Sequence, residues 1–256
     1  MTRHGNFFDT SMLPLRSALF LISQFLLTIP YSVGCFILFP FLSHAKRYWV
    51  AVGWCRTMLW ICRWVCGIRY RVIGCENLPD GPAVLLSKHQ SVWETFALPG
   101  LMPRPLCFVF KRELLFVPFF GWALGLLSMI HINRKKGSDA FQSIVNQGKQ
   151  RLSEGSWIIL FPEGTRTPIG TRKKFKSGGA RLAVTAKAVV VPIAHNAGRF
   201  WPRHSFLKYP GEITISIGPV IHTAGCTAEA VNSEAQAWIE KEMYRLDPKA
   251  HLCRQE

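Results

Sequence analysis

The residues best suited to chemistry begin with a histidine and an acid five positions apart, His89 and Glu94, just after the apolar run at residues 83–86. An imidazole can take a proton from an alcohol near neutral pH, and a carboxylate partner fixes its tautomer and stabilises the imidazolium that forms. On one regular helix, five residues turn the side chains about 140° apart. The pair therefore meets only if His89 precedes a helix and Glu94 lies in its first turn.

Glu94 also has a purely structural interpretation. Ser91 and Glu94 have the spacing of a capping box, in which the serine caps a helix and the glutamate accepts a hydrogen bond from the serine's backbone amide. The sequence leaves both roles of Glu94 open. Ser91 itself is a poor nucleophile candidate, because no Gly-x-Ser-x-Gly turn surrounds it.

The second constellation is Phe-Pro-Glu-Gly-Thr-Arg at residues 161–166, which again follows an apolar run. Gly164 permits a positive φ angle, so the chain can turn back toward the strand ends. Arg166 is then able to present a planar, permanently charged guanidinium to a phosphate. An ordinary surface turn with an exposed arginine is the alternative, and the hexapeptide alone does not decide between them.

Other reactive residue types have simpler interpretations. His131 and His195 lie in or beside apolar runs, which predicts packed, hydrogen-bonded histidines. The basic run at residues 172–176 is typical of a solvated face, which on a membrane protein can touch anionic headgroups. No Walker loop, dinucleotide fingerprint or metal-ligand spacing occurs, and the eight cysteines lack zinc-site spacing. We therefore expect no metal and no bound cofactor.

Together the two constellations resemble the signature of the glycerolipid acyltransferase family, a His-x4-acid motif with a Phe-Pro-Glu-Gly-Thr-Arg block about seventy residues further on. Residues 110–114, with Pro118 and Gly121, look like the family's second motif. Residues 132–134 are similar to its Ile-x-Arg strand end, and residues 191–193 to its proline-containing fourth motif. The resemblance covers about residues 70–220 in the family's order. One departure is that the family's usual acid is aspartate, whereas position 94 is glutamate.

The resemblance implies both a reaction and residue roles. His89 would be the catalytic base and Glu94 its partner, in a transfer of a fatty acyl group from acyl-CoA or acyl-carrier protein to the sn-2 hydroxyl of lysophosphatidic acid. The product would be phosphatidic acid. Another lysophospholipid or a lyso-aminolipid as acceptor stays open, as does a non-enzymatic basic membrane-binding protein. The substrate-binding residues implied by the resemblance are Lys111, Arg134, Glu163, Gly164, Thr165 and Arg166.

Apolar runs separated by turn residues predict the elements that position these side chains. Their alternation is typical of an α/β structure, so we expect a mixed, largely parallel central sheet flanked by helices. The apolar run at residues 114–130 is interrupted by Pro118, Gly121 and Gly125, and it predicts a buried helix or the wall of an acyl-chain groove. Strands are expected at residues 83–86, 107–110, 129–132, 157–161, 189–194 and 212–217, and helices at 92–98, 138–152, 179–187 and 228–246.

Residues 17–42 contain no charged residue. As a straight helix they would measure about 39 Å, longer than the roughly 30 Å hydrocarbon layer, so they predict a retained helical membrane anchor. Pro30 near the middle leaves a single span and a bent, one-leaflet anchor both open. Residues 48–65 carry Arg56 and Arg63 among four tryptophans, which favours an interfacial helix over a second span. The predicted division is an anchor with its interfacial helix at 1–69 and an α/β acyltransferase domain at 70–256.

The chain has 31 Lys and Arg against 15 Asp and Glu, a formal charge of +16. This favours a polyanionic neighbour such as a phospholipid surface, a phosphorylated substrate or nucleic acid. The long uncharged run and the gathering of tryptophans near it favour the membrane over nucleic acid. We expect as partners a lysophospholipid acceptor, an acyl-CoA or acyl-carrier protein donor and the bilayer. The expected location is the bacterial inner membrane, with the catalytic domain facing the cytoplasm.

Overall fold

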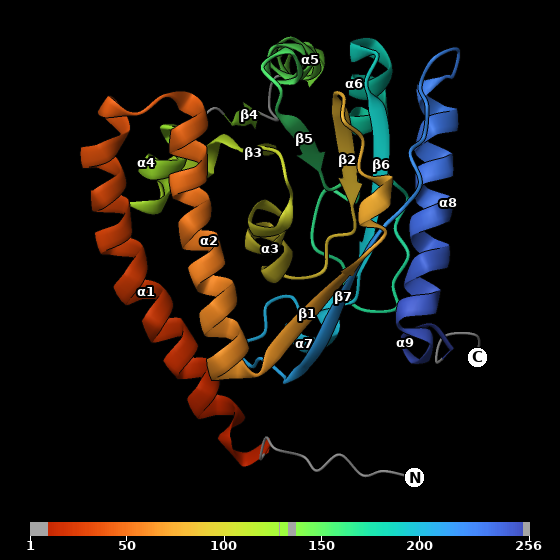
Figure 1. Ribbon diagram of the computed structural model, residues 1–256. Coiled ribbons are helices and arrows are strands. Elements are labelled where there is room, and N and C mark those ends of the chain that lie inside the picture. The colour runs from red at the N-terminus through yellow and green to blue at the C-terminus, as the bar shows by residue number, and fades with distance from the viewer. Residues whose placement is uncertain (1–9, 128, 133–136, 253–256) are drawn as a thin grey trace.

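The computed structural model describes residues 10–127, 129–132 and 137–252. Within these residues, seven strands form one sheet in the order β1-β7-β6-β2-β5-β3-β4 (Figure 1). Every neighbouring pair is parallel except β6 and β7. The predicted mixed, largely parallel sheet is confirmed. The strands are β1 (Ile68–Ile73), β2 (Ala83–Ser87), β3 (Leu106–Lys111), β4 (Ile130–Ile132), β5 (Trp157–Leu160), β6 (Val189–His195) and β7 (Gly211–Ile217).

The helices flank this sheet, and the four predicted from the sequence are present with ends that differ by a few residues at most. They are α3 (Trp93–Leu101), α5 (Gly137–Ser153), α6 (Gly178–Ala186) and α8 (Ala228–Leu246). The further α-helices are α1 (Leu13–Leu38), α2 (His44–Cys66), α4 (Phe120–Gly125), α7 (Ala197–Phe200) and α9 (Pro248–Leu252). Short 3-10 helices are η1 (Thr10–Met12), η2 (Phe39–Phe41), η3 (Cys75–Asn77) and η4 (Arg112–Phe116).

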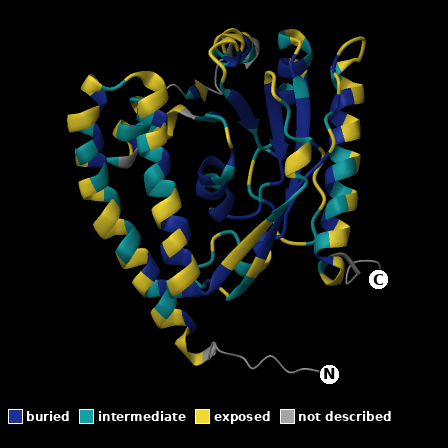
Figure 2. Ribbon diagram, viewed as in Figure 1, coloured by how far each residue is buried: buried dark blue, intermediate teal, exposed yellow. Residues whose placement is uncertain are grey.

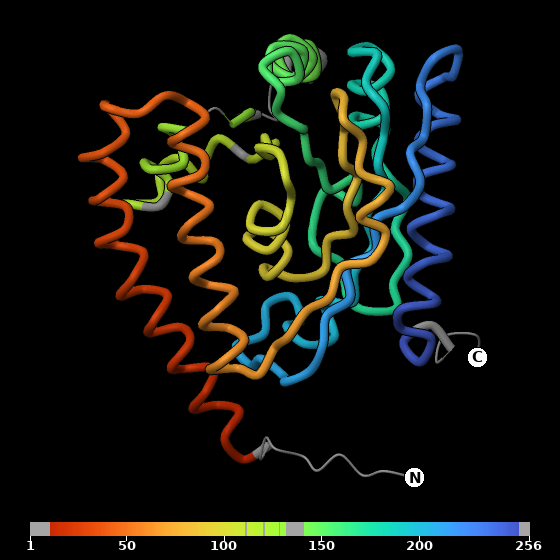
Figure 3. Tube along the Cα trace, viewed as in Figure 1, coloured from red at the N-terminus to blue at the C-terminus, as the bar shows by residue number. Residues whose placement is uncertain are grey.

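Alternation along the buried strands divides the core into two layers. Leu85 of β2 packs in a cluster with side chains of α2 and α3, whereas its neighbours Val84 and Leu86 pack in a second cluster with α5, α6 and α8. The sheet therefore lies between two helical layers. Figure 3 shows the red-to-orange hairpin of α1 and α2 on one side of the sheet and the blue α8 on the other.

The parallel strands β2, β3, β5 and β6 end at the same edge of the sheet. Side chains that follow these strands therefore gather there, which is where α/β sheets commonly bind ligands. His89 comes two residues after β2, Glu163 three residues after β5, and His195 is the last residue of β6.

Two parts of the fold differ from the sequence expectation. Strand β1, an edge strand paired with β7, was not predicted. The run at residues 114–130 is not one buried helix, because it is divided between η4, α4 and β4, and Phe116 and Trp122 are 73% and 50% exposed. Other parts of the run, including Leu115 and Leu124, line a cavity of about 400 Å³, as a groove wall would.

The apolar N-terminal helix is present and begins at Leu13. With the turn that follows it, through Phe41, it is the one helix in the described part of the chain that is long and apolar enough to cross a membrane. It packs against α2, and many of its apolar residues are exposed. Figure 2 colours the exposed residues yellow. A soluble domain would bury such a surface, so α1 favours association with a membrane.

Candidate active site

His89 and Glu94 meet where the loop after β2 enters α3. Nδ1 of His89 lies 2.9 Å from Oε1 of Glu94. Because a carboxylate only accepts hydrogen bonds, Nδ1 carries the proton and Nε2 keeps a free lone pair. The imidazole also stacks on Phe161, with ring centroids 3.9 Å apart, and within the described residues Nε2 has no hydrogen-bond partner. The ring is thus fixed with its basic nitrogen available.

The same oxygen of Glu94 makes the glutamate half of the capping box, whereas the serine half is shifted, because Val92 and not Ser91 is the N-cap residue of α3. This oxygen accepts from the backbone N–H groups of Gln90 and Ser91 at 2.9 and 2.8 Å, while the Ser91 hydroxyl accepts from the N–H of Trp93 at 3.2 Å. Burial alone would raise the pKa of Glu94, but nearby His195, His89 and the Ser91 amide hold that pKa below its ordinary value. Glu94 is therefore an anion near neutral pH. The two interpretations of Glu94 are compatible, since one carboxylate serves both.

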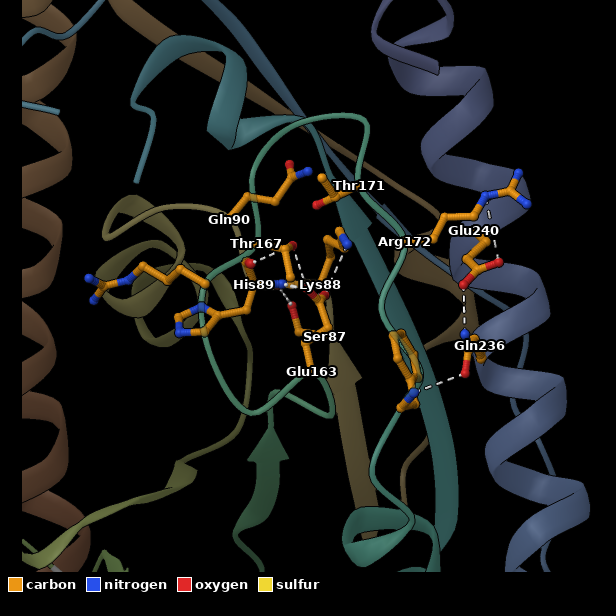
Figure 4. A network of polar contacts seen from close by, with 12 residues as sticks. Ser87, Lys88, His89, Gln90, Glu163, Thr167, Thr171, Arg172, Gln236 and Glu240 are labelled. Carbon is orange, nitrogen blue, oxygen red and sulfur yellow. Dashed lines mark hydrogen bonds and ion pairs between the residues drawn. The ribbon is translucent and has the colours of Figure 1, made fainter. Parts of the chain in front are cut away.

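Glu163 is fully buried and contacts the backbone of His89. Its Oε1 accepts from the His89 N–H at 3.1 Å and lies 3.1 Å from Nζ of Lys88. Its Oε2 is hydrogen-bonded to the hydroxyl of Thr167, whose own N–H donates to the His89 carbonyl at 2.8 Å. The loop after β5 thus binds both peptide groups of His89 (Figure 4).

The turn that carries this glutamate has the predicted conformation. Gly164 adopts a φ of +72°, and its N–H donates to the carbonyl of Phe161 at 2.9 Å. Thr165 is exposed, and Arg166 is partly buried with its carbonyl accepting from Nη1 of Arg203 at 2.7 Å. The far end of the loop is held to α8, where the N–H of Phe175 donates to Gln236 at 3.0 Å (Figure 4).

The remaining predicted site residues lie at the edges of what the structure describes. Lys111 ends β3 at the same sheet edge, but its side chain is not among the described side chains. Arg134 lies outside the described residues. The structure therefore brings together His89, Glu94 and Glu163, and the turn with Gly164, Thr165 and Arg166 directly follows Glu163.

His195 is packed and hydrogen-bonded as predicted, whereas His131 is exposed, so the prediction of burial was wrong there. Nε2 of His195 donates to the Lys88 carbonyl at 2.8 Å, and its Nδ1 accepts from the N–H of Ala197 at 3.3 Å. One donor and one acceptor on the ring define a neutral imidazole. Burial lowers the pKa of His195, in agreement with that neutral form.

This burial predicts a loss of stability in mild acid. Below the ordinary histidine pKa of 6.5, His195 is protonated in the unfolded chain but stays neutral in the folded protein. The free energy of unfolding therefore decreases as the pH is lowered. The slope is about 1.4 kcal/mol per pH unit while only the unfolded chain takes the proton. Glu94 does not contribute to this pH dependence, because its pKa lies below the ordinary value of 4.5 and it stays ionised above that pH. Thermal melts between about pH 8 and 5 on wild type and His195→Gln check this. Equal slopes for both proteins would show that His195 is not the group responsible.

A basic histidine nitrogen at the carboxyl edge of a largely parallel sheet, held by a buried carboxylate, is an arrangement suited to deprotonating an alcohol. Residues 69–196 match the acyltransferase family, and the chain belongs to this family.

Two named relatives lie close to it. The chain is 48% identical over 217 residues to the 1-acyl-sn-glycerol-3-phosphate acyltransferase of Pseudomonas aeruginosa, a match that covers 83% of this chain and 84% of that protein. Human 1-acyl-sn-glycerol-3-phosphate acyltransferase beta is 30% identical over 167 residues, covering 64% of this chain and 60% of the human protein.

The fold has a counterpart among solved structures. The crystal structure of PlsC, the 1-acyl-sn-glycerophosphate acyltransferase of Thermotoga maritima, superposes with a TM-score of 0.78 and covers 93% of this chain and 97% of that one. At 19% sequence identity, this similarity is one of fold.

Proposed function

We propose that the protein transfers a fatty acyl group from acyl-CoA or acyl-carrier protein to the sn-2 hydroxyl of lysophosphatidic acid, which yields phosphatidic acid and a free thiol. The observation that carries this proposal is the 2.9 Å contact between His89 Nδ1 and a buried Glu94, because it leaves Nε2 as an oriented base. The named relatives, both called 1-acyl-sn-glycerol-3-phosphate acyltransferases, support the choice of acceptor.

The proposed reaction is one direct transfer. Nε2 of His89 accepts the proton of the acceptor hydroxyl while the hydroxyl oxygen bonds to the thioester carbonyl carbon. Collapse of the tetrahedral intermediate breaks the C–S bond, and the protonated His89 returns the proton to the leaving thiolate. Glu94 keeps the ring in one tautomer and stabilises the imidazolium between these steps. No acyl-enzyme and no bound metal or cofactor take part.

Basic residues around the site suit a phosphorylated acceptor. We assign the acceptor's phosphate to Arg166, Lys111 and Arg134, with the turn at Gly164 and Thr165 beside it. A guanidinium offers two parallel hydrogen bonds to phosphate oxygens. Glu163 is different, because its buried carboxylate is already occupied by His89, Lys88 and Thr167. We therefore propose that Glu163 positions the His89 loop rather than binding substrate.

An acceptor panel tests this function. Purified full-length protein would be given one acyl-CoA or acyl-carrier protein with lysophosphatidic acid, a second lysophospholipid or a lyso-aminolipid, and kcat/KM compared. We expect the highest value with lysophosphatidic acid, whose terminal phosphate monoester carries the most negative charge toward Arg166. A clear preference for another acceptor would refute the assignment of lysophosphatidic acid while keeping acyl transfer.

We further propose that the enzyme works on the cytoplasmic face of the bacterial inner membrane. The exposed apolar surface of α1 continues onto η4 and α4. The contact between α1 and α4 includes Phe36 and Trp122, whose ring centroids are 6.4 Å apart. On α2, Trp60 and Trp64 are exposed and the Arg63 guanidinium lies over the Trp64 ring, a composition that suits the headgroup layer. A lipid acceptor then reaches the site without crossing water.

A charged substitution in this apolar surface should weaken membrane binding. Phe41 and Phe116 are 84% and 73% exposed, and transfer of each phenyl ring into the bilayer contributes about 1.5–3 kcal/mol. We expect the double variant Phe41→Asp/Phe116→Asp to bind anionic vesicles at least about tenfold more weakly in flotation assays. Tyr244→Asp, on α8 across the sheet, is the matched control. Equal binding of the double variant and the control would place the membrane contact elsewhere.

A further inference from the structure

Lys88 is a buried cation to which the proposed acyl transfer gives no part. Its side chain is 7% exposed, and its ammonium lies 3.1 Å from Oε1 of Glu163. Its backbone is tethered as well, since its N–H donates to the Ile193 carbonyl at 2.9 Å and its carbonyl accepts from Nε2 of His195. A lysine is seldom buried to this degree unless it is paired.

The partner of Lys88 is one of two buried carboxylates beside the same histidine. Glu94 contacts the imidazole of His89, and Glu163 contacts the backbone N–H of His89. Both are fully buried. Two carboxylates in one water-poor region favour uptake of a proton, either by one of them or by a nearby base.

In the part of the chain that the structure describes, the ionisable groups around His89 come from four parts of the fold. They are Lys88 on its own loop, Glu94 on α3, Glu163, Arg166 and the exposed Lys176 on the loop after β5, and His195 at the end of β6. His195 is neutral, and Arg166 and the neighbouring Arg203 are only partly buried, so water screens their charges. Arg199 of α7 is paired with Asp247. Among the described residues around His89, the fully buried charges are therefore two carboxylates against one ammonium, which leaves a single uncompensated negative charge.

We propose that Lys88 is a positioning residue that sets the charge around His89: by neutralising Glu163, it leaves Glu94 as the one unbalanced carboxylate facing the imidazole. This inference rests on the proposed role of His89 as the base. Before proton transfer the buried cluster carries one net negative charge, and the proton that arrives on His89 brings it to neutrality. Figure 4 shows the Lys88 ammonium and the His89 ring on opposite sides of the loop, so Lys88 acts through Glu163 rather than on substrate.

The proposal predicts shifts of opposite sign for the two halves of the pair. Lys88→Met leaves Glu163 unpaired, adds a negative charge near His89 and favours its protonated form. The acid limb of the kcat/KM profile should then move to higher pH by about one unit, so that kcat/KM at pH values below both midpoints is about tenfold lower. Glu163→Gln leaves Lys88 unpaired and should move the limb to lower pH. The double variant Lys88→Met/Glu163→Gln, with no unpaired charge, should return the limb to its wild-type position.

The test is a set of pH profiles on full-length protein, from about pH 5 to about pH 9, with thermal melts on each variant. Lys88→Arg keeps the positive charge, so the acid limb of its kcat/KM profile should stay at the wild-type pH. Lys241→Met, on the exposed side of α8, is the surface control. If Lys88→Met does not fold, recovery of folding in the double variant supports the pairing, because removal of both charges leaves none buried alone. If the double variant recovered neither folding nor the wild-type position of the acid limb, the proposed role of Lys88 would be wrong.

A second readout does not depend on acyl transfer. Labelled histidine, with the signal that disappears in His89→Ala assigned to His89, reports the titration of that ring directly by NMR. We expect the titration midpoint to rise in Lys88→Met and fall in Glu163→Gln. Midpoints that stay in place, or move the same way in both variants, would contradict the proposed charge balance. If the wild-type protein showed no acyl transfer, the proposed function would be refuted. The NMR titration of His89 would still test the role of Lys88.

Discussion

Replacement of His89 by alanine should lower turnover by about 10²–10⁴-fold, the usual contribution of a general base. The fold should survive, because the contacts that hold this loop are to the His89 backbone and are made by Glu163 and Thr167, which alanine leaves in place. The lost ring is partly exposed, so the core keeps its packing. The measurement is kcat with lysophosphatidic acid, together with the melting temperature and the membrane-bound fraction.

The matched control for this substitution is His222→Ala, since His222 is exposed after β7 and has no proposed role. It should retain near-wild-type turnover. If His89→Ala were folded, membrane-bound and as active as His222→Ala, the base would have to be another group and the proposed mechanism would fail.

Replacement of Glu94 by glutamine should lower turnover by about 10²-fold or more while changing stability little. The glutamine carbonyl oxygen can still accept from the N–H groups of Gln90 and Ser91, so the capping contacts survive. What disappears is the negative charge that stabilises protonated His89 across the 2.9 Å contact. Steady-state kinetics and thermal melts on the two proteins separate these effects.

Glu94→Asp completes this comparison. Aspartate keeps the charge but is one methylene shorter, so we expect part of the activity to return, with some loss of the capping contacts. An active and stable glutamine variant would mean that Glu94 serves only the helix start. A glutamine variant as unstable as Glu94→Ala would mean that the charge holds the loop itself.

Much of the site could be predicted because its geometry depends on short-range spacing. The condition that His89 precede a helix and Glu94 lie in its first turn is met at the loop between β2 and α3. Gly164 takes the positive φ that its place in the turn requires. The order of the strands in the sheet was not predictable in this way. The alternation of predicted strands with predicted helices was enough to predict a mixed, largely parallel sheet.

The parts that were missed depend on contacts between distant segments. Strand β1 has charged residues Arg69 and Arg71 and lies at the sheet edge, so it lacks the apolar run by which the buried strands were recognised. Lys88 stands in a polar loop, and only the arrival of Glu163 from a position 75 residues later allows its burial. The segment at residues 114–127 is apolar, but Phe116 and Trp122 are exposed beside α1, and an apolar run on a surface has the same sequence pattern as one in a core.

The most direct test of direct acyl transfer to lysophosphatidic acid is a rapid-mixing measurement of thiol release by purified full-length protein. Mixed with an acyl thioester alone, the enzyme should release no burst of thiol, because no covalent acyl-enzyme forms. Addition of lysophosphatidic acid should then yield thiol and phosphatidic acid in equal amounts, at a rate that His89→Ala reduces by about 10²-fold or more. A thiol burst without acceptor, or thiol release without phosphatidic acid, would contradict the account.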